Sequence, residues 1–430
     1  MKIEFLNKET IVKLICDLQN RNPENYSAQE AAVKTIVESV REKGDDALVS
    51  YTKEFDKVDI LPEAFLVTED EYMEAYEKSD AGFVEVLRKA LANIRDFHEK
   101  QRQNSWFTCD EDGVILGQKV TPLERVGIYV PGGKAAYPSS VLMNIVPAKV
   151  AGVSEIIMVT PPQANGAVRP LTLVAAKEAG ADKVYKVGGA QAIAALAFGT
   201  KTIPRVDKIT GPGNIYVTLA KKAVFGSVAI DAIAGPSEIL VIADKSANPK
   251  FIAADLLSQA EHDELACAIL ITTDKSLANE VCRLVDEEMT QAPRKDIIEK
   301  SIENYGLILI ADNLEEAINA ANEVASEHLE LHVENPFEAM TKIKNAGAIF
   351  IGDYSCEPVG DYYAGPNHVL PTNRTARFFS PLSVDDFIKK SSIISYSKEA
   401  LEKTWKDIDL FAKEEGLYAH ARSVEVRFED

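Results

Sequence analysis

The chain has 430 residues and a formal net charge of -20, and 46% of its residues are hydrophobic. Its length suggests roughly two to four domains, because a typical domain holds about 100 to 200 residues. The acidic balance argues against nucleic acid or an anionic membrane surface as the partner, since both attract clustered lysine and arginine. A cationic small molecule is a better match for an acidic site.

No apolar run approaches the ~20 residues that a membrane helix needs, and the N-terminal sequence MKIEFLNKET resembles neither a signal peptide nor a transit peptide. We therefore expect a cytoplasmic protein. The cysteines are scattered without a C-x-x-C pair, which argues against a disulfide framework and against a cysteine-rich zinc site. They are Cys16, Cys109, Cys267, Cys282 and Cys356.

Residues 1 to about 108 are charged and helical in pattern, and a long amphipathic stretch ends near Gln103. His98 in this stretch is predicted to be solvated. From about Val126, short apolar runs end in Gly and Pro clusters and alternate with helical stretches, and a second such series spans 268 to 353. This alternation, without hairpin turns, predicts parallel α/β units of the doubly wound kind. The charged helical tail from about Ser380 is expected to dock on another surface, such as that of a second subunit.

Three Gly-rich loops follow predicted strands, where open α/β sheets bind ligands. In VGIYVPGG, glycines 132 and 133 would let the backbone approach a ligand, and Tyr129 would present its ring or hydroxyl. In KVGGAQAIAA a helix starts near Gln191, and helix N-termini attract anions. In ITGPGN the Asn214 amide is placed to bridge two polar groups. None is the G-x-G-x-x-G fingerprint, so a phosphate-bearing or dinucleotide ligand and plain turns both remain open.

The segment FIAADLLSQAEHDE sets Gln259 and His262 three residues apart on one face at the end of an amphipathic helix. Imidazole suits zinc and other divalent transition metals, whereas glutamine is an unusual ligand. The spacing therefore indicates either one part of a metal site or a surface-facing helix end.

In ASEHLELHVEN, Glu327 and His328 are adjacent just before a predicted strand. Neighbouring side chains on a strand point to opposite faces, so the two serve one site only from an irregular segment at its entrance. Such a pair can divide general-base work, with glutamate activating water. A surface Glu-His pair is the alternative, and His332 is predicted to be solvated on the outward face of the strand.

Two later segments add oxygen and nitrogen ligands. GDYYAGPNHVLPTN places Asp361 and His368 in a predicted loop, and KEEGLYAHARSVEVR places Glu415 and His420 around a glycine. A carboxylate can ligate a divalent metal through oxygen. Gln259, His262, Asp361 and His420 together make a plausible N2O2 shell.

These motifs together resemble the histidinol dehydrogenase family. The resemblance starts with IDAIAGPSEILVIADKSANPKFIAADLLSQAEH and includes VGIYVPGG, VGGAQAIAALAFG, VDKITGPGN, SEHLE, GDYYAGPNHVLPT and EGLYAHA. The segments stand in the family's order and cover residues 120 to 430, while the first hundred residues are less distinctive.

The resemblance implies the oxidation of L-histidinol through L-histidinal to L-histidine, the end of histidine biosynthesis, with two NAD+ reduced in succession. It implies one zinc ion per subunit and a homodimer with shared active sites. The residues carried over are Gln259, His262, Asp361 and His420 for zinc, the last from the partner subunit; Glu327 and His328 for catalysis; Ser237, Gln259, His262, His328, Asp361, Glu415 and His420 for substrate; and Tyr129, Gln191 and Asn214 for NAD. Glu415 is preferred to Glu414 because it lies five residues before His420, as the family spacing requires.

The expected fold is α/β, with two incomplete Rossmann-like domains, parallel-type sheets and small helical segments at both ends. The expected ranges are 1–26 for an N-terminal helical segment, 27–128 and 236–380 for a first α/β domain with the metal and catalytic residues, 129–235 for an NAD-binding α/β domain, and 381–430 for a helical tail that docks on the partner subunit.

Three other functions are compatible with parts of the sequence. A zinc hydrolase would use the metal residues and Glu327, but it would give no function to the loops at 129, 191 and 214. A related dehydrogenase would act on another amino alcohol or diol. A non-catalytic metal or nucleotide-binding module would not need Glu327 and His328.

Overall fold

The computed structural model describes residues 1–21, 26–132 and 136–429 and divides them into two compact units. The first unit contains Met1–Gln101 and Leu123–Phe387, and the second contains Arg102–Pro122 and Ile388–Asp430. Gly133, for which a ligand-facing backbone is expected, lies outside the described residues. Within the described ranges, no helix has the length and apolarity that a membrane crossing requires.

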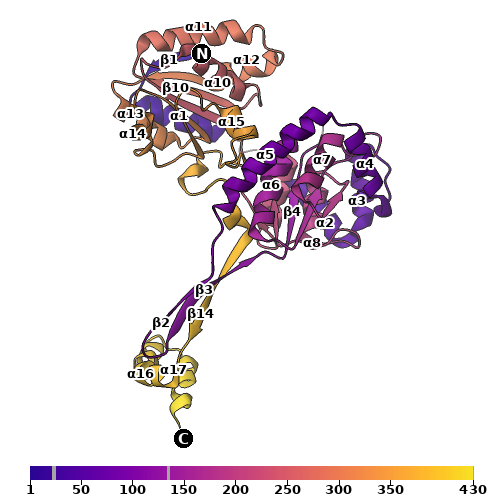
Figure 1. Ribbon diagram of the computed structural model, residues 1–430, viewed down its shortest axis with the longest axis vertical. Coiled ribbons are helices and arrows are strands. Elements are labelled where there is room, and N and C mark those ends of the chain that lie inside the picture. The colour runs from indigo at the N-terminus through magenta and orange to yellow at the C-terminus, as the bar shows by residue number, and fades with distance from the viewer. Residues whose placement is uncertain (22–25, 133–135, 430) are drawn as a thin grey trace. The chain divides into compact units, whose positions relative to one another are not determined.

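The first unit contains a six-stranded parallel sheet in the order β1-β11-β10-β9-β12-β13 (Figure 1). Its strands are β1 Lys2–Phe5, β9 Glu238–Ala243, β10 Cys267–Thr272, β11 Gly306–Ile310, β12 His328–His332 and β13 Ala348–Ile351. Its helices are α1 Lys8–Asn20, α10 Pro249–Ala260, α11 Lys275–Met289, α12 Lys295–Tyr305, α13 Leu314–Val324, α14 Pro336–Met340 and α15 Glu357–Tyr362. The order of strands and crossover helices is that of a doubly wound α/β fold, as predicted.

Both faces of this sheet are covered, which explains why its central strands are almost continuously apolar. Alternate residues of β9 enter two separate cores: Ile239 and Val241 pack with α10, α11 and α12, whereas Leu240 and Ile242 pack with α1 and α13. Neither face of a central strand in this sheet is exposed to solvent. The prediction that His332 of β12 is solvated is wrong for this reason: the side chain is 1% exposed.

The first unit also contains a five-stranded parallel sheet in the order β6-β5-β4-β7-β8. Its strands are β4 Arg125–Tyr129, β5 Glu155–Val159, β6 Lys183–Tyr185, β7 Lys208–Thr210 and β8 Ala229–Ile230, with helices α6 Pro138–Ala151, α7 Pro170–Ala179, α8 Gly189–Phe198 and α9 Ile215–Val224. Helices α6 and α7 pack on one face, and α8 and α9 pack on the other. Two sheets of this kind confirm the predicted α/β class.

The α-helices between α1 and β2 pack on the helices of the five-stranded sheet. They are α2 Ser27–Lys43, α3 Asp45–Tyr51, α4 Glu69–Glu77 and α5 Ala81–Glu99. Helix α2 contacts α8 and α9, α4 contacts α7, and α5 contacts α6. The apolar faces of these helices are therefore buried against the 129–235 region.

His98, near the end of α5, is also buried, contrary to prediction. Its Nδ1 lies 2.7 Å from the amide oxygen of Gln101, and its Nε2 lies 3.4 Å from the Asn367 amide nitrogen. Burial lowers the pKa of His98, which keeps the ring neutral. The ring therefore acts as a packed, hydrogen-bonded side chain.

The second unit contains an antiparallel sheet in the order β14-β3-β2 and two helices. The strands are β2 Trp106–Cys109, β3 Ile115–Pro122 and β14 Ile388–Ser395, and the helices are α16 Lys398–Glu414 and α17 Tyr418–Glu425. The predicted helical tail thus starts with a strand. Many large apolar side chains of this unit are exposed: Trp106, Phe107, Leu116, Ile394, Tyr396, Ile408, Leu410, Phe411, Leu417, Tyr418 and Val426.

Candidate active site and metal centre

Glu327 and His328 lie at the start of β12, side by side with the first residue of β9. The backbone N-H of Glu238 donates to Oε2 of Glu327 at 2.9 Å, and the backbone carbonyl of Glu238 lies 3.0 Å from Nδ1 of His328. Because a carbonyl can only accept, Nδ1 carries the hydrogen in this contact. One residue of the central strand thus orients both side chains.

The second imidazole nitrogen of His328 is buried and has no hydrogen-bond partner among the described residues. It lies 3.8 Å from Oδ1 of Asp361 and 3.9 Å from Oε1 of Glu357. With Nδ1 donating to a carbonyl, Nε2 is the nitrogen at which the ring gains or loses its second proton. Proton exchange with a bound group would therefore take place at Nε2.

Burial raises the pKa of Glu327 to about 8, although the neighbouring His328 opposes the shift. Burial alone would lower the pKa of His328, but the carboxylates of Glu327, Glu357 and Asp361 outweigh it and raise this pKa to about 10. Asp361 shows the reverse effect: burial would raise its pKa, but His328, His368 and His262 hold it below the ordinary value. Proton positions in this group are therefore set by mutual charge, as is common at active sites.

Side chains from α15 and from the turn that follows α10 form a group of possible metal ligands beside His328. One donor atom each of His262, Glu357 and Asp361 lies within 4.8 Å of the other two. Turned with its nitrogen toward them, the Gln259 amide would donate to both oxygens of Glu357 at 3.2 Å, whereas a metal would require its oxygen. The imidazole nitrogen of His262 and the carboxylate oxygens of Glu357 and Asp361 fit a zinc ion.

Glu357 was not predicted from the sequence. It lies four residues before Asp361, so on a helix both carboxylates share one face. The Gly and Pro residues of CEPVGDYYAGPNH indicate a loop, whereas residues 357–362 form α15. His368, in the loop that follows, points its Nδ1 at the backbone carbonyl of Asp361 at 3.0 Å.

A second buried group lies further along β12. Donor atoms of Asp255, Glu330 and His332 lie within 4.8 Å of one another. Nε2 of His332 is 3.2 Å from Glu330, and its Nδ1 is 3.1 Å from Asp353. Burial raises the pKa of Asp255 to about 8, with the Glu330 carboxylate adding to the shift. The ion pairs within the group account for the burial of His332.

The predicted substrate residue Ser237 lies in the first unit, whereas Glu415 and His420 lie in the second unit. Ser237 directly precedes β9, and its carbonyl accepts a 3.0 Å hydrogen bond from the Cys267 N-H. Glu415 caps the end of α16 and His420 lies on α17, both exposed and both in the second unit. Their predicted roles at the metal centre therefore stay predictions.

The residues expected to contact NAD lie at the carboxyl edge of the five-stranded sheet. Tyr129 ends β4, and its hydroxyl accepts from the Gly189 N-H at 3.2 Å. Gln191 in the first turn of α8 is 1% exposed. Asn214 is the N-cap of α9, and its side-chain oxygen accepts from Tyr216 and Val217 N-H, so this oxygen already serves the helix.

Two buried acceptors at this edge lack partners within the described part of the chain: Oε1 of Gln191 and Oγ1 of Thr210, the last residue of β7. Strands β4 and β7 are neighbours although β5 and β6 intervene in sequence, so the strand order reverses between them. Ligands of open α/β sheets bind at such a point. The orphaned acceptors thus fit a ligand with hydroxyl or amide donors.

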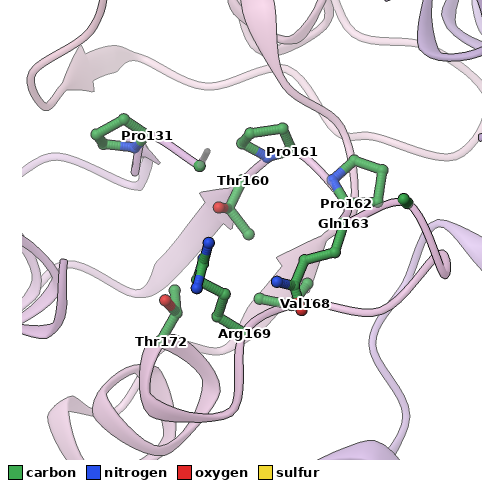
Figure 2. A pocket seen from close by; sticks show the side chains of 10 residues that line it. Pro131, Thr160, Pro161, Pro162, Gln163, Val168, Arg169 and Thr172 are labelled. Atoms are coloured by element: carbon green, nitrogen blue, oxygen red, sulfur yellow. The ribbon is translucent and has the colours of Figure 1, made fainter. Parts of the chain in front are cut away.

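A cavity of about 260 Å³ lies beyond the ends of β4 and β5 (Figure 2). Figure 2 shows the Arg169 side chain between Thr160 and Thr172. The remaining lining residues are Pro131, Gly132, Pro161, Pro162, Gln163, Ala164 and Val168. An arginine at the start of a helix favours an anionic group.

Gly132 also has a role in packing. A Cβ at this position would lie 2.4 Å from Cγ of Pro161. The missing side chain therefore allows the loops after β4 and β5 to touch each other.

The fold and these groups define an α/β protein in which one sheet reverses its strand order and the other carries a buried acid-base pair beside metal-capable side chains, a combination typical of enzymes. The family model described as histidinol dehydrogenase matches residues 19–428. The chain therefore belongs to the histidinol dehydrogenase family, a family of oxidoreductases. This membership favours the dehydrogenase over the hydrolase and the non-catalytic module.

Similar proteins match along the whole chain. The histidinol dehydrogenase of Halalkalibacterium halodurans is 58% identical over 430 residues, 100% of both chains, and that of Listeria monocytogenes serovar 1/2a is 56% identical over 422 residues, 98% of both. The crystal structure of histidinol dehydrogenase from Elizabethkingia anophelis superposes with a TM-score of 0.93 at 40% identity, covering 99% of this chain and 97% of that one. The agreement extends to the first hundred residues, which the motifs left less distinctive.

Proposed function

We propose that this chain oxidises L-histidinol through L-histidinal to L-histidine, reducing two NAD+ per substrate with one zinc ion per subunit. Family membership supports the reaction class. The observation that carries the proposal is the buried Glu327–His328 pair, whose unpartnered Nε2 lies beside the donor atoms of Glu357 and Asp361. A cytoplasmic location is part of the same proposal.

In this proposal the positive charge of a bound metal and substrate would offset the carboxylate charge that raises the pKa of His328, and His328 takes the hydroxyl proton of the alcohol at Nε2. Glu327, held by the Glu238 N-H, takes a proton from the water that adds to the aldehyde and releases it to solvent, while His328 gives its proton to the carbonyl oxygen. His328 then takes a proton of the hydrate as the second hydride leaves. When bound, NAD+ supplies the hydride acceptor, and zinc supplies positive charge that orients the substrate's amine and imidazole. Asp361 and Glu357 add negative charge that suits a cationic amine.

Zinc would be held by His262, Asp361 and Gln259, with Glu357 as a further oxygen donor and His420 contributed by a partner subunit. The second carboxylate-imidazole group, near His332, has internal ion pairs and is not needed for this role. If zinc binds in the first group, binding requires the carboxylate of Asp361. If zinc binds in the second group, binding requires the carboxylates beside His332 instead.

We expect Asp361→Asn to lose zinc and activity together, because one anionic ligand is removed. The matched variant Asp255→Asn, in the second group, should keep both. Metal content after dialysis and activity after zinc is added back measure the effect. Zinc retained by Asp361→Asn but lost by Asp255→Asn would place the metal in the second group instead.

For NAD, the proposal assigns Tyr129, Gln191 and Asn214 to the dinucleotide. The unpartnered acceptors of Gln191 and Thr210 support it, because a buried acceptor without a donor is costly and a ligand would supply one. The Arg169 cavity is smaller than the roughly 300 Å³ or more of a complete ligand site, so it would hold only one anionic or ribose part of the dinucleotide.

A homodimer with shared active sites is also proposed. The second unit exposes large apolar side chains of β14, α16 and α17, and exposed apolar patches often mark an interface. Glu415 and His420 lie in this unit, so its docking on a second copy would bring them to another chain's Glu327 and His328. The second unit would then complete the partner's site.

This arrangement predicts complementation between two inactive variants. Mixing His420→Asn with Glu327→Gln chains, after unfolding and refolding together, should restore activity. Each mixed dimer then has one site with intact Glu327 from one chain and intact His420 from the other. Each variant refolded alone is the control. No recovery in a mixture shown to contain mixed dimers would contradict the shared site.

A further inference from the structure

Helix α15 carries two groups of the candidate metal centre, Glu357 and Asp361, on one face. Its first turn is fixed by polar contacts: the N-H of Glu357 donates to Oε1 of Glu330 at 3.1 Å, and the hydroxyl of Ser258 donates to Glu357 at 3.4 Å. Its last turn, which holds Asp361, lies against an aromatic ring from β13. The position of Asp361 therefore depends on how closely the helix approaches that ring.

The ring belongs to Phe350, and it meets the helix at Gly360. A Cβ at position 360 would lie 2.7 Å from Cε1 and 2.9 Å from Cζ of the ring, closer than any normal contact. Gly360 is not among the glycines with a left-handed backbone, so any residue could adopt its conformation. Only the size of the side chain excludes other residues here.

On its other side the Phe350 ring adjoins the catalytic candidate. Its centroid is 6.0 Å from that of the His328 ring, with the two planes tilted by 38°. Phe350 and His328 lie on adjacent parallel strands, with Glu330 of β12 directly opposite Phe350. The ring thus fills the space between the start of β12 and the end of α15.

We infer that Phe350 and Gly360 act as a spacer that sets the distance between α15 and His328, and thereby the geometry of the metal-binding group. This inference rests on the proposed zinc site. Phe350 and Gly360 are positioning residues, since neither offers a ligand atom. Zinc-oxygen bonds are about 2.0–2.2 Å long, so a displacement of Asp361 caused by one added methyl group is enough to disturb the ligand set.

The test is a double-variant cycle read by zinc binding alone. Gly360→Ala forces the helix away from the ring and should weaken zinc binding about 10- to 100-fold, as changes around a metal's ligands commonly do. Phe350→Leu removes ring atoms that the new methyl would meet. The combined variant, Gly360→Ala with Phe350→Leu, should therefore bind zinc more tightly than Gly360→Ala alone.

Zinc affinity is measured by competition with a chromophoric chelator, and cobalt substitution reports the ligand set through its visible spectrum. Gly127→Ala, on β4 of the five-stranded sheet, is the matched control, because its Cβ would lie 2.8 Å from Cδ1 of Leu196 on α8. It should lower the melting temperature without changing zinc affinity. Melting curves of all variants separate general destabilisation from loss of the site.

Three results would overturn the inference. If Gly360→Ala binds zinc as the unchanged chain does, the contact does not set the site. If the two substitutions weaken binding additively, they do not act through one contact. If the unchanged chain binds no zinc, the proposed metal site itself fails, and the inference fails with it; this outcome is distinct because it appears before any substitution is made.

Discussion

Replacing Glu327 by glutamine is expected to stop the reaction after the first oxidation, whereas replacing His328 by asparagine should slow both oxidations. Glu327 is proposed to activate the water that adds to the aldehyde, so the variant retains a base for the alcohol but none for hydration. Loss of one acid-base group typically costs about 10²- to 10⁴-fold in rate. The rate with L-histidinol and the rate with L-histidinal, each measured separately, show which step is lost.

Glu315→Gln is the matched control, because this glutamate is exposed in the first turn of α13, whereas Glu327 follows the last turn of that helix. It should keep both rates. Circular dichroism and melting curves establish that each variant is folded. A Glu327→Gln chain that oxidises L-histidinal as fast as the unchanged chain would remove Glu327 from the mechanism, while leaving His328 to be judged by its own variant.

Replacing Arg21 by methionine is expected to destabilise the first unit strongly. The Arg21 side chain is fully buried and forms an ion pair with Glu238, which is itself 2% exposed. Arg21 also donates to the carbonyl of Leu265 at 3.1 Å. Removing one member of a buried pair leaves a charge without a partner and typically costs about 3–5 kcal/mol. Chemical unfolding measures the change in the free energy of unfolding.

The loss should depend on pH in a defined direction. Burial raises the pKa of Glu238 and Arg21 opposes this shift, so without Arg21 the folded chain holds the Glu238 proton more tightly than the unfolded chain does. A pKa raised by folding contributes stability below the unfolded value, near 4.3, and this contribution is lost as pH rises. The Arg21→Met penalty should therefore be smaller at pH 5 than at pH 8.

Two further variants test the reason for the penalty. Arg21→Met combined with Glu238→Leu replaces both charges by apolar groups and should recover most of the stability. Lys208→Met removes one member of the less buried pair with Asp386, 11% and 28% exposed, and should cost less. An Arg21→Met loss that does not change with pH would show that packing, rather than the unpaired carboxylate, causes it.

The ion pair of Arg21 is a contact that the sequence alone does not predict. The pattern of residues 1–108 predicts helices but no chemistry, yet Arg21 pairs with the residue whose backbone holds Glu327 and His328. No local pattern links positions 21 and 238, because the contact depends on tertiary packing of α1 against the sheet. The two parallel sheets, in contrast, follow from apolar runs that alternate with helical periods, which are local signals.

For similar reasons, only some residues of the candidate site could be predicted from the sequence. The i, i+3 spacing of Gln259 and His262, and the strand that begins at His328, follow from local periodicity. Glu357 was missed because α15 is short and bounded by Gly and Pro. His98 and His332 were predicted as solvated because charged neighbours in sequence do not show which faces other helices cover. Glu415 and His420 would reach the site only through a second chain. No pattern within one sequence shows where a second chain binds.

The number of NADH molecules formed per L-histidinol consumed tests the proposed function most directly. With substrate limiting and NAD+ in excess, the proposal predicts two NADH per L-histidinol, and loss of NADH formation after zinc is removed by a chelator. Formation of only one NADH per substrate, with L-histidinal accumulating, would contradict the four-electron oxidation that we propose for this chain.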